Sequence, residues 1–552
     1  MQNFISNTKY KTVTLLGGVN IIGKKISILL ISILCISLVV GCVNQGTSPN
    51  TVSKGTTVKI GSPNTIKAAN AFDTNLGIFM KISNLTLTKM DENGKIVGQM
   101  ASKYEVSSDN KTWKFYIDPD LYWSDGKKVI PEDVKFSIEY YANKIPYAGW
   151  IKQSVESVTV IPRDNAVELK FKEPYTRTNL EFATYNILPK HVWESIPDPI
   201  NYIQTDNYVG CGPYFVSNVN LDSQIVTLKK NPYWKGKQSI VDTIEVHMYN
   251  TNDTLALDLE NGNLDVYYKY AGSYPYSNIQ KLTDTGKYDI IQKMNVGLIF
   301  LGMNLQRQPM SDLKFRNAMS YAINYEEIVK IDALGYGSVP NRGFVPPTME
   351  FYKDTPKLEY NVEKANQLLE EAGYKDNNGN GIRETLEGKD IKIIMLIRSD
   401  YVRSGELVRD YLKKVGIDVT LKSVDTSTWI SLKDKYYYDL TITRTTPWGM
   451  LMHAQWGTGY FDSRRTGEGV LHILDDTEFT KICDGILSTT DAVKIQTYAY
   501  QVQDYYSENL PGITLCWNEN ITPYGKKFNG WYVDPLYGIY NTDTFLNLEK
   551  AS

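Results

Sequence analysis

The sequence predicts an α/β protein that contains a parallel β-sheet, because strand and helix patterns alternate in its C-terminal half. Residues 390–397, 417–424 and 440–443 are short runs of apolar and β-branched residues, as in buried strands. Residues 405–415 and 428–435, which separate these runs, are expected to be helices. A β-α-β-α-β order predicts strands that run parallel in one sheet.

Length and composition indicate a large globular protein. A chain of 552 residues exceeds one compact core, so two or three domains are expected. The hydrophobic content of 42% and the charged content of 22% are ordinary for a folded protein. The net charge of -3 gives no indication of a nucleic-acid partner.

The N-terminus has the pattern of an export signal. Lys24 and Lys25 precede residues 26–40, which are apolar except for three Ser. This stretch is shorter than the ~20 residues of a membrane span and has the length of a signal-peptide hydrophobic region. It ends in Val-Val-Gly-Cys at Cys42, which resembles the lipobox of exported lipoproteins. Residues 1–42 are therefore expected to be a signal peptide that leaves Cys42 lipidated, and the alternative is a one-pass membrane anchor. Residues 43–55, rich in Ser, Thr, Asn and Gly, predict a flexible linker.

Further strands are expected wherever apolar and polar residues alternate between turn residues. In chain order these are residues 57–61, 85–90, 94–96, 113–117, 158–161, 166–171, 214–218, 224–229, 243–248, 264–267 and 512–517.

Further helices are expected where start and stop signals frame an apolar stripe. Pro131 suits a first helical position, Asn324 with Glu327 forms a capping box, and Asn361 with Gly373 brackets another helix. In chain order the expected helices are residues 131–143, 254–262, 313–322, a helix after 324, and 362–372, 479–487 and 492–506.

The loop after the third predicted strand is the first candidate for a ligand site. Ligands of open α/β sheets bind beyond the carboxyl ends of the strands, which is where residues 444–460 are expected. This loop carries Arg444, Trp448, His453 and Trp456, a mixture suited to a small polar or charged molecule. Each Trp can equally be a core residue, and Arg444 can equally form an internal salt bridge.

Residues 376–387 match the calcium-loop pattern D-x-N-x-N-G-x5-E. Asp376, Asn378, Asn380 and Glu387 would supply side-chain oxygens, and Ile382 would supply a carbonyl. Only two of these ligands are charged, so a structural calcium ion would bind weakly. The alternative is a polar turn stabilised by its Asn and Gly residues.

Enzyme signatures are missing from the sequence. It has four His and none in H-x-x-x-H spacing, and no G-x-S-x-G, GxxxxGK[ST] or C-x-x-C occurs. Two of the three cysteines Cys211, Cys483 and Cys516 can form a disulfide, but the sequence does not assign which two. We therefore expect a protein that is not an enzyme and requires no cofactor; the alternative from another class is a peptide hydrolase.

Four blocks in order along the chain resemble the extracellular solute-binding proteins, family 5, the peptide and nickel class that serves ABC importers. The first contains WKFYIDPDLYWSDG, the second begins GCGPYF, the third is SDLKFRNAMSYAINYEEIV, and the fourth is YNVEKANQLLEEAGYKDNNGNGIRE. They cover residues 101–140, 210–237, 311–329 and 360–384.

The resemblance implies a two-lobed periplasmic-binding-protein-like fold (type II) with mixed sheets and a ligand cleft between the lobes. Lobe 1 would be discontinuous, a region at its side would be inserted into it, and the chain would cross between lobes near Leu298 and Trp517. The expected ranges are 56–84, 206–298 and 517–552 for lobe 1, 85–205 for the inserted region and 299–516 for lobe 2.

The function implied is capture of a solute outside the cytoplasmic membrane and its delivery to ABC permease subunits in that membrane. A monomer held on the outer face of the membrane by its lipid anchor is expected. A peptide or peptide-like solute is the leading ligand, a nickel chelate is the alternative, and a sugar oligomer is a third, since indoles also stack on sugars.

Ligand residues implied by the resemblance lie in several segments. The loop keeps the residue spacing of the nickel-binding branch of the family at Arg444, Thr445, His453 and Ala454. Trp150 resembles a Trp of the same branch. The arginines that would hold an anionic chelate appear here as Tyr147 or Tyr185. Peptide binders usually hold the amino terminus with an Asp on the loop, for which Asp462 is the nearest candidate although its offset differs. Trp123, in the first block, completes the candidate ligand residues.

Overall fold

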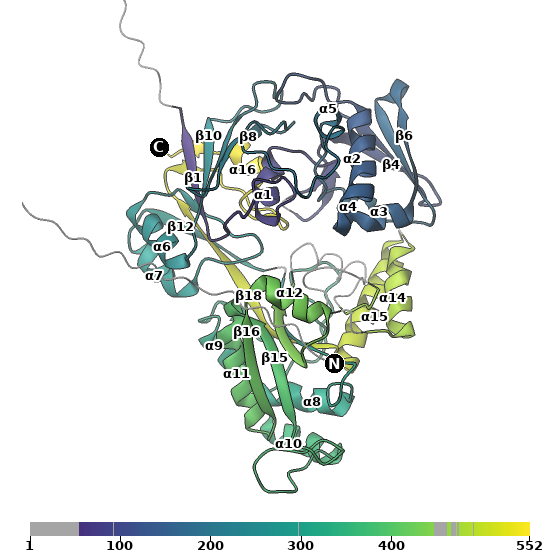
Figure 1. Ribbon diagram of the computed structural model, residues 1–552, viewed down its shortest axis with the longest axis vertical. Helices are drawn as coiled ribbons and strands as arrows, with labels where there is room; N and C mark the ends of the chain where they lie inside the picture. Colours follow the sequence, from purple (N-terminus) through teal and green to yellow (C-terminus); the bar gives the residue numbers. More distant parts are fainter. Residues whose placement is uncertain are drawn as a thin grey trace, which may run out of the picture. The chain divides into compact units, whose positions relative to one another are not determined.

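The computed structural model describes residues 55–91, 93–295, 297–445, 461–464, 471, 474–489 and 491–551 (Figure 1). The predicted signal peptide, Cys42, and almost all of the predicted linker lie outside these residues, as do Trp448, His453 and Trp456. No helix in the described part of the chain is both long and apolar enough to cross a membrane.

The predicted parallel segment is confirmed. β15 (Lys392–Arg398) lies between β16 (Asp418–Val424) and β17 (Leu440–Arg444) and runs parallel to both. α11 (Val402–Lys413) and α12 (Thr426–Asp434) are the connecting helices, as expected. All three strands therefore end on the same side of the sheet, and Arg398 and Arg444 are the last residues of β15 and β17.

The sheet continues through antiparallel strands. β17 pairs with β13 (Ile299–Met303), which pairs with the first half of β18 (Gly512–Gly525). The second half of β18 pairs with β12 (Tyr288–Met294) and contacts β11 (Val266–Tyr267). Figure 1 shows β18 as one long yellow strand that runs past both groups of strands. β18 is longer than the predicted 512–517 because its polar second half is held by pairing with β12 and not by its own propensity.

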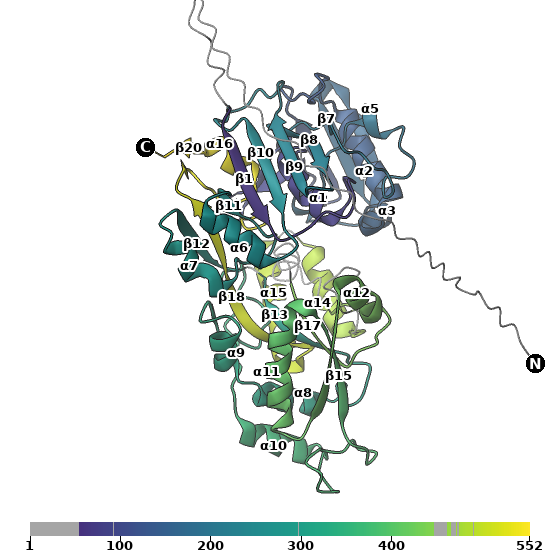
Figure 2. The ribbon, with the colours of Figure 1, turned by 60° about the vertical axis from the view of Figure 1, so that its left-hand side comes forward.

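The other end of the same sheet is built around β1 (Thr57–Ser62), which runs parallel to both β11 and β10 (Thr243–Met248). β10, β9 (Ile225–Lys230) and β8 (Tyr214–Asn220) form the predicted antiparallel series, side by side in Figure 2. The order along the main path of the sheet is β16-β15-β17-β13-β18-β11-β1-β10-β9-β8, and β12 pairs with β18 outside this path.

Residues 101–171 form a separate four-stranded sheet of order β4-β5-β7-β6. Its strands are antiparallel, with bounds Ala101–Val106, Thr112–Ile117, Ala166–Phe171 and Val155–Ile161 in that order. α2 (Pro131–Lys144) packs on this sheet and has Pro131 in its first turn, as predicted.

The helix caps expected from the sequence are also present. The Asn324 side chain accepts from the Glu327 N–H at 3.0 Å at the start of α9 (Tyr325–Ile331). Asn361 accepts from the Lys364 N–H at 2.9 Å at the start of α10 (Val362–Glu371). The other helices are α1 (Thr74–Phe79), α3 (Gly149–Ser154), α4 (Thr178–Glu181), α5 (Lys190–Trp193), α6 (Asn252–Asn261), α7 (Ile279–Thr283), α8 (Leu313–Ala322), α14 (Thr477–Leu487), α15 (Ala492–Asn509) and α16 (Thr542–Asn547).

The short strands complete the fold. They are β2 (Thr88–Met90) with β3 (Ile96–Gly98), β14 (Gly337–Ser338) on β18, and β19 (Phe528–Asn529) with β20 (Glu549–Lys550). β2 and β3 form the hairpin predicted around residue 92. β2 is shorter than the expected strand 85–90, and β3 begins at the last residue of the expected strand 94–96.

One apolar cluster joins segments that are far apart in sequence. It contains Met90 and Leu180 from the region 85–205, Phe344 and Phe461 from the region 299–516, and Leu536 near the C-terminus. Side chains of this cluster are nearly fully buried, so these three segments pack into one core. The boundaries of the predicted lobes stay predictions.

Candidate functional site

A cavity of about 330 Å³ lies beside the β12–β18 pair, and we call it the central cavity. This volume lies at the lower end of the roughly 300–1,000 Å³ of sites that hold organic ligands. Its lining comes from the loop after β11, from β12 and β18, and from residues 533–539. The lining residues are Tyr268, Lys269, Ala271, Gly272, Ile291, Lys293, Met294, Asn295, Thr348, Asn520, Thr522, Val533, Asp534, Pro535, Leu536, Tyr537, Gly538 and Ile539.

Two polar atoms of this lining have no hydrogen-bond partner in the described part of the protein: the Tyr268 hydroxyl and the Asn520 Oδ1. Tyr268 is only 4% exposed. An unsatisfied buried polar group destabilises a protein by about 1–3 kcal/mol, so both atoms are suited to bonding with a bound molecule. Burial raises the pKa of Tyr268 well above its usual value, so its hydroxyl remains a donor.

Two lysines, Lys269 and Lys293, also line the cavity. Neither forms an ion pair with any described residue. Burial lowers the pKa of Lys269, and the nearby cations Arg444 and Arg398 lower it further, while Asp400 opposes them. The side of the cavity formed by Lys269 is therefore electropositive.

Arg444 approaches the same loop from the end of β17. Its guanidinium donates to the carbonyl oxygen of Ala271, a cavity residue whose backbone has φ of 50°, in the left-handed region. The sequence left two partners open for Arg444, an internal carboxylate or an anion of the ligand. The described residues provide a carbonyl and no carboxylate, so contact between Arg444 and a ligand stays a prediction.

Asp534 is the carboxylate that lines the cavity. It is buried, and its Oδ1 accepts from the backbone N–H groups of Leu536 at 2.7 Å and Tyr537 at 2.6 Å. Burial raises the pKa of Asp534 to about 7, so the carboxyl is only partly ionised near neutral pH. Asp534 therefore offsets only part of the positive charge of the lysines.

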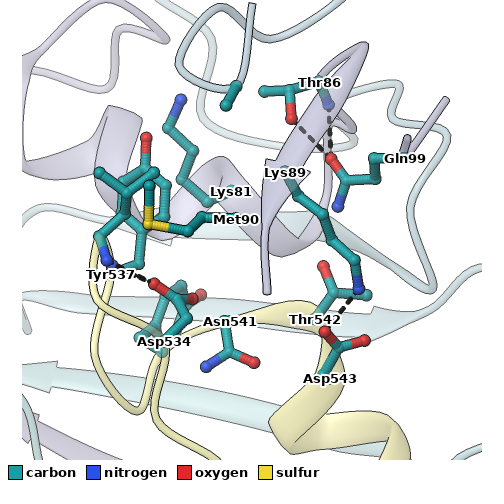
Figure 3. A pocket seen from close by; sticks show the side chains of 13 residues that line it. Lys81, Thr86, Lys89, Met90, Gln99, Asp534, Tyr537, Asn541, Thr542 and Asp543 are labelled. Carbon is teal, nitrogen blue, oxygen red and sulfur yellow. Dashed lines mark hydrogen bonds and ion pairs between the residues drawn. The ribbon is translucent and has the colours of Figure 1, made fainter. Parts of the chain in front are cut away.

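A second, smaller pocket of about 40 Å³ shares Asp534, Leu536 and Tyr537 with the central cavity. Figure 3 shows Lys81, Lys89 and Asp543 around it. Lys89 pairs with Asp543, and Lys81 donates to Asn186 Oδ1 at 3.0 Å. Burial lowers the pKa of Lys81 to about 7. A pocket of this size holds a water molecule and not a solute, so the central cavity is the better candidate.

Trp150 and Trp123, both predicted to contact ligand, have different environments. Trp150 is half-buried, stacks on Tyr175 with ring centroids 5.3 Å apart, and donates from its indole N–H to the Tyr185 hydroxyl at 2.8 Å. Trp123 is 0% exposed, and its indole N–H donates to Asp133. The expectation for Trp123 is corrected, because a fully enclosed indole has no surface left for a solute. Contact between Trp150 and a ligand stays a prediction.

Asp462 is buried inside the protein and paired there with a cation. It is 0% exposed, and both of its carboxylate oxygens accept from the guanidinium of Arg464, at 2.9–3.3 Å. Arg464 bonds to Asp484 of α14 as well. The expectation that Asp462 holds a peptide amino terminus is therefore corrected: its charge is already paired inside the protein.

The predicted calcium loop is a polar turn with bonds among its own residues. Asp376 accepts from the backbone N–H groups of residues 379, 380 and 381. Asn378 and Asn380 donate to Asp390, and Asn380 accepts from the Ile382 N–H at 2.8 Å. The Glu387 carboxylate pairs instead with Lys389 at 3.5 Å and is 79% exposed. Asp390, and not Glu387, is thus the second carboxylate that these side chains contact.

No group of three or more His, Cys, Asp or Glu side chains in the described residues is arranged to hold a metal ion. No disulfide forms among the three described cysteines, all of which are buried.

The central cavity contains residues that the sequence analysis missed, above all Tyr268, Lys269 and Asn520. Tyr268 and Lys269 directly follow β11, so the strand-end rule that selected Arg444 would have found them too. Asn520 lies inside β18, beyond the predicted end of that strand, and no local signal marks it.

Known proteins resemble this chain over most of its length. Residues 95–466 match the family described as bacterial extracellular solute-binding proteins, family 5 Middle. The oligopeptide-binding protein AppA of Bacillus subtilis is 23% identical, over 83% of this chain and 84% of that protein. The nickel-binding periplasmic protein of Escherichia coli is 22% identical, over 68% and 70%.

The fold agrees with a solved relative. The structure of the Bacillus subtilis AppA protein in complex with a nonapeptide superposes with a TM-score of 0.77 at 20% identity, covering 90% of this chain and 99% of that one. This likeness shows that the α/β chain with its mixed sheets has the two-lobed binding-protein fold.

Proposed function

This chain belongs to the bacterial extracellular solute-binding proteins, family 5, and we propose that it captures a peptide or peptide-like solute for an ABC importer. In this role it binds the solute outside the cytoplasmic membrane and delivers it to the permease subunits. It transports and does not transform its ligand.

The central cavity is the observation that supports this proposal most directly. It lies among strand ends and crossing strands, where binding proteins of this fold hold their ligands. The hydroxyl of Tyr268 and the amide oxygen of Asn520 offer a donor and an acceptor, as a peptide's carbonyl and N–H groups require. A relative with the same fold holds a nonapeptide.

The loop 444–460 is proposed to complete the site. It continues from Arg444, which already contacts the cavity residue Ala271. Trp448 and Trp456 would offer flat apolar walls, and His453 would donate or accept near neutral pH.

A nickel chelate is the second candidate. The loop keeps the residue spacing of the nickel-binding branch of the family at Arg444, Thr445, His453 and Ala454. A nickel-binding relative also matches the chain. One histidine cannot hold a transition metal firmly, so a chelator would have to supply the other donors.

We further propose that residues 1–42 direct export and that a lipid on Cys42 tethers a monomer to the outer face of the membrane. A tethered binder meets its permease at a high effective concentration. Residues 43–55 would be the flexible tether.

Native mass spectrometry of protein purified from its own cells tests the ligand class. The expected result is a set of retained peptides or peptide-like molecules, released on denaturation. Nickel found by elemental analysis of the same sample would support the second candidate. A retained sugar oligomer would contradict both.

A further inference from the structure

We propose that the solute is an anionic peptide-like molecule with at least two carboxylates, an inference that rests on the proposed function. It concerns the chemical class that the central cavity selects.

The cations around the cavity exceed the carboxylates that could pair with them. Lys269 and Lys293 line it and form no ion pair with a described residue. Arg444 is a third cation beside the cavity. Its guanidinium donates to the carbonyl oxygen of Ala271, a neutral group. Lys293 is exposed, whereas Lys269 and Arg444 are half-buried. Partial burial of these two cations without a carboxylate is unfavourable unless a bound anion compensates their charge.

The carboxylates nearby do not remove this excess. Asp534 lines the cavity, but its charge is partly lost through protonation near neutral pH. Asp400, which acts electrostatically on Lys269, is exposed and forms no ion pair with it. Water screens an exposed carboxylate of this kind.

The sequence that follows Arg444 offers no carboxylate for a positively charged amino terminus. Residues 446–460 contain neither Asp nor Glu. Asp462, which follows them, is held by Arg464. A ligand with several carboxylates would find a partner at each basic side chain of the cavity.

The two cavity atoms without a hydrogen-bond partner also suit an anionic peptide-like ligand. The buried Tyr268 hydroxyl is a donor and suits a carboxylate oxygen. The Asn520 Oδ1 is an acceptor and suits an amide N–H. A molecule that has both carboxylates and amide groups, as an acidic peptide does, satisfies both atoms.

The test compares three tetrapeptides of equal length, Ala-Glu-Glu-Ala, Ala-Gln-Gln-Ala and Ala-Lys-Lys-Ala, by calorimetric titration of ligand-free protein. The Glu peptide is expected to bind at least ten-fold more tightly than the Gln peptide, and the Lys peptide more weakly than both. Raising the NaCl concentration should narrow the difference, because salt screens the charges.

The variant Lys269→Met tests whether the cavity is the source of the preference for the Glu peptide. It should reduce the preference for the Glu peptide over the Gln peptide at least five-fold. Lys67→Met is the matched control, since Lys67 is exposed and outside the cavity lining, and should keep the preference.

Equal affinity for the three peptides would overturn the inference and leave the proposed function intact. A preference that survives in Lys269→Met would overturn it too, because the selectivity would arise elsewhere. If no peptide binds, the inference fails, and the solute released in native mass spectrometry decides separately whether the proposed function also fails.

Discussion

Asp462 and Arg464 form a charged pair next to the predicted ligand loop. By sequence, Asp462 is an acidic residue near a ligand loop. In the structure it is fully buried and bonded to Arg464, which also reaches Asp484. A buried carboxylate needs its cation, so this pair belongs to the framework of the protein.

Arg464→Met is expected to lower the free energy of unfolding by about 3 kcal/mol, because it removes the guanidinium that bonds to both oxygens of the buried Asp462 carboxylate. Urea denaturation measures this difference. Arg163→Met is the matched control: Arg163 forms an ion pair with Asp164 at 3.7 Å but is 85% exposed, so its loss should change stability by less than about 1 kcal/mol.

Ligand affinity of the folded Arg464→Met protein should match that of the wild type. A large loss of affinity with unchanged stability would show that Asp462 serves the ligand after all.

Among the elements, the turn at residues 376–387 has the sequence of an ion-binding loop and the hydrogen bonds of a polar turn. Its backbone N–H groups converge on Asp376, and its two Asn side chains contact Asp390. A weak calcium site stays a prediction, with Asp390 replacing Glu387 in the expected donor set.

In 10 mM CaCl2 the protein should gain about 1.4 kcal/mol of stability, if the dissociation constant is about 1 mM, as in weak extracellular sites. Thermal melts in CaCl2 and in MgCl2 measure the gain. Asp376→Ala should abolish it, and Glu387→Ala should keep it. Identical melts with both salts would contradict a calcium site at this loop.

β18 is the element that sequence analysis described least completely. Its apolar start, residues 512–517, was predicted, whereas the continuation to Gly525 depends on pairing with β12. β12 and β13 were not predicted at all. Because β12 and β18 lie more than 200 residues apart, neither strand carries a local signal of the other.

At the scale of the whole molecule, the proposed tether decides where the binding protein works. Cys42→Ala should remove the lipid attachment site and shift the protein from the membrane fraction to the soluble fraction or leave it unprocessed, because stable anchoring takes at least two acyl chains. Fractionation and the mass of the N-terminal peptide measure the change. Cys35→Ala, in the same export segment, is the control and should stay anchored.

If the Cys42→Ala protein is processed and extracted by detergent as the wild type is, the lipid anchor is wrong.

The sequence by itself determined the features that depend on local chemistry. The parallel unit β15-β16-β17 follows from alternating apolar runs, and the helix starts at Asn324 and Asn361 follow from capping residues. The four family blocks likewise predicted a binding protein with mixed sheets. Arg444 was found because the end of a parallel strand is a fixed place in such a fold.

Only the tertiary structure decided the lining of the cavity and the status of individual candidates. The central cavity joins residues 268–272, 291–295, 520–522 and 533–539, which pattern analysis of single segments cannot bring together. Trp123 and Asp462 were ruled out by neighbours from the packed fold, Asp133 for one and Arg464 for the other. Whether a side chain is buried or paired depends on contacts between segments that are distant in sequence. For that reason the same residue type can pack in the core at one position and contact a ligand at another.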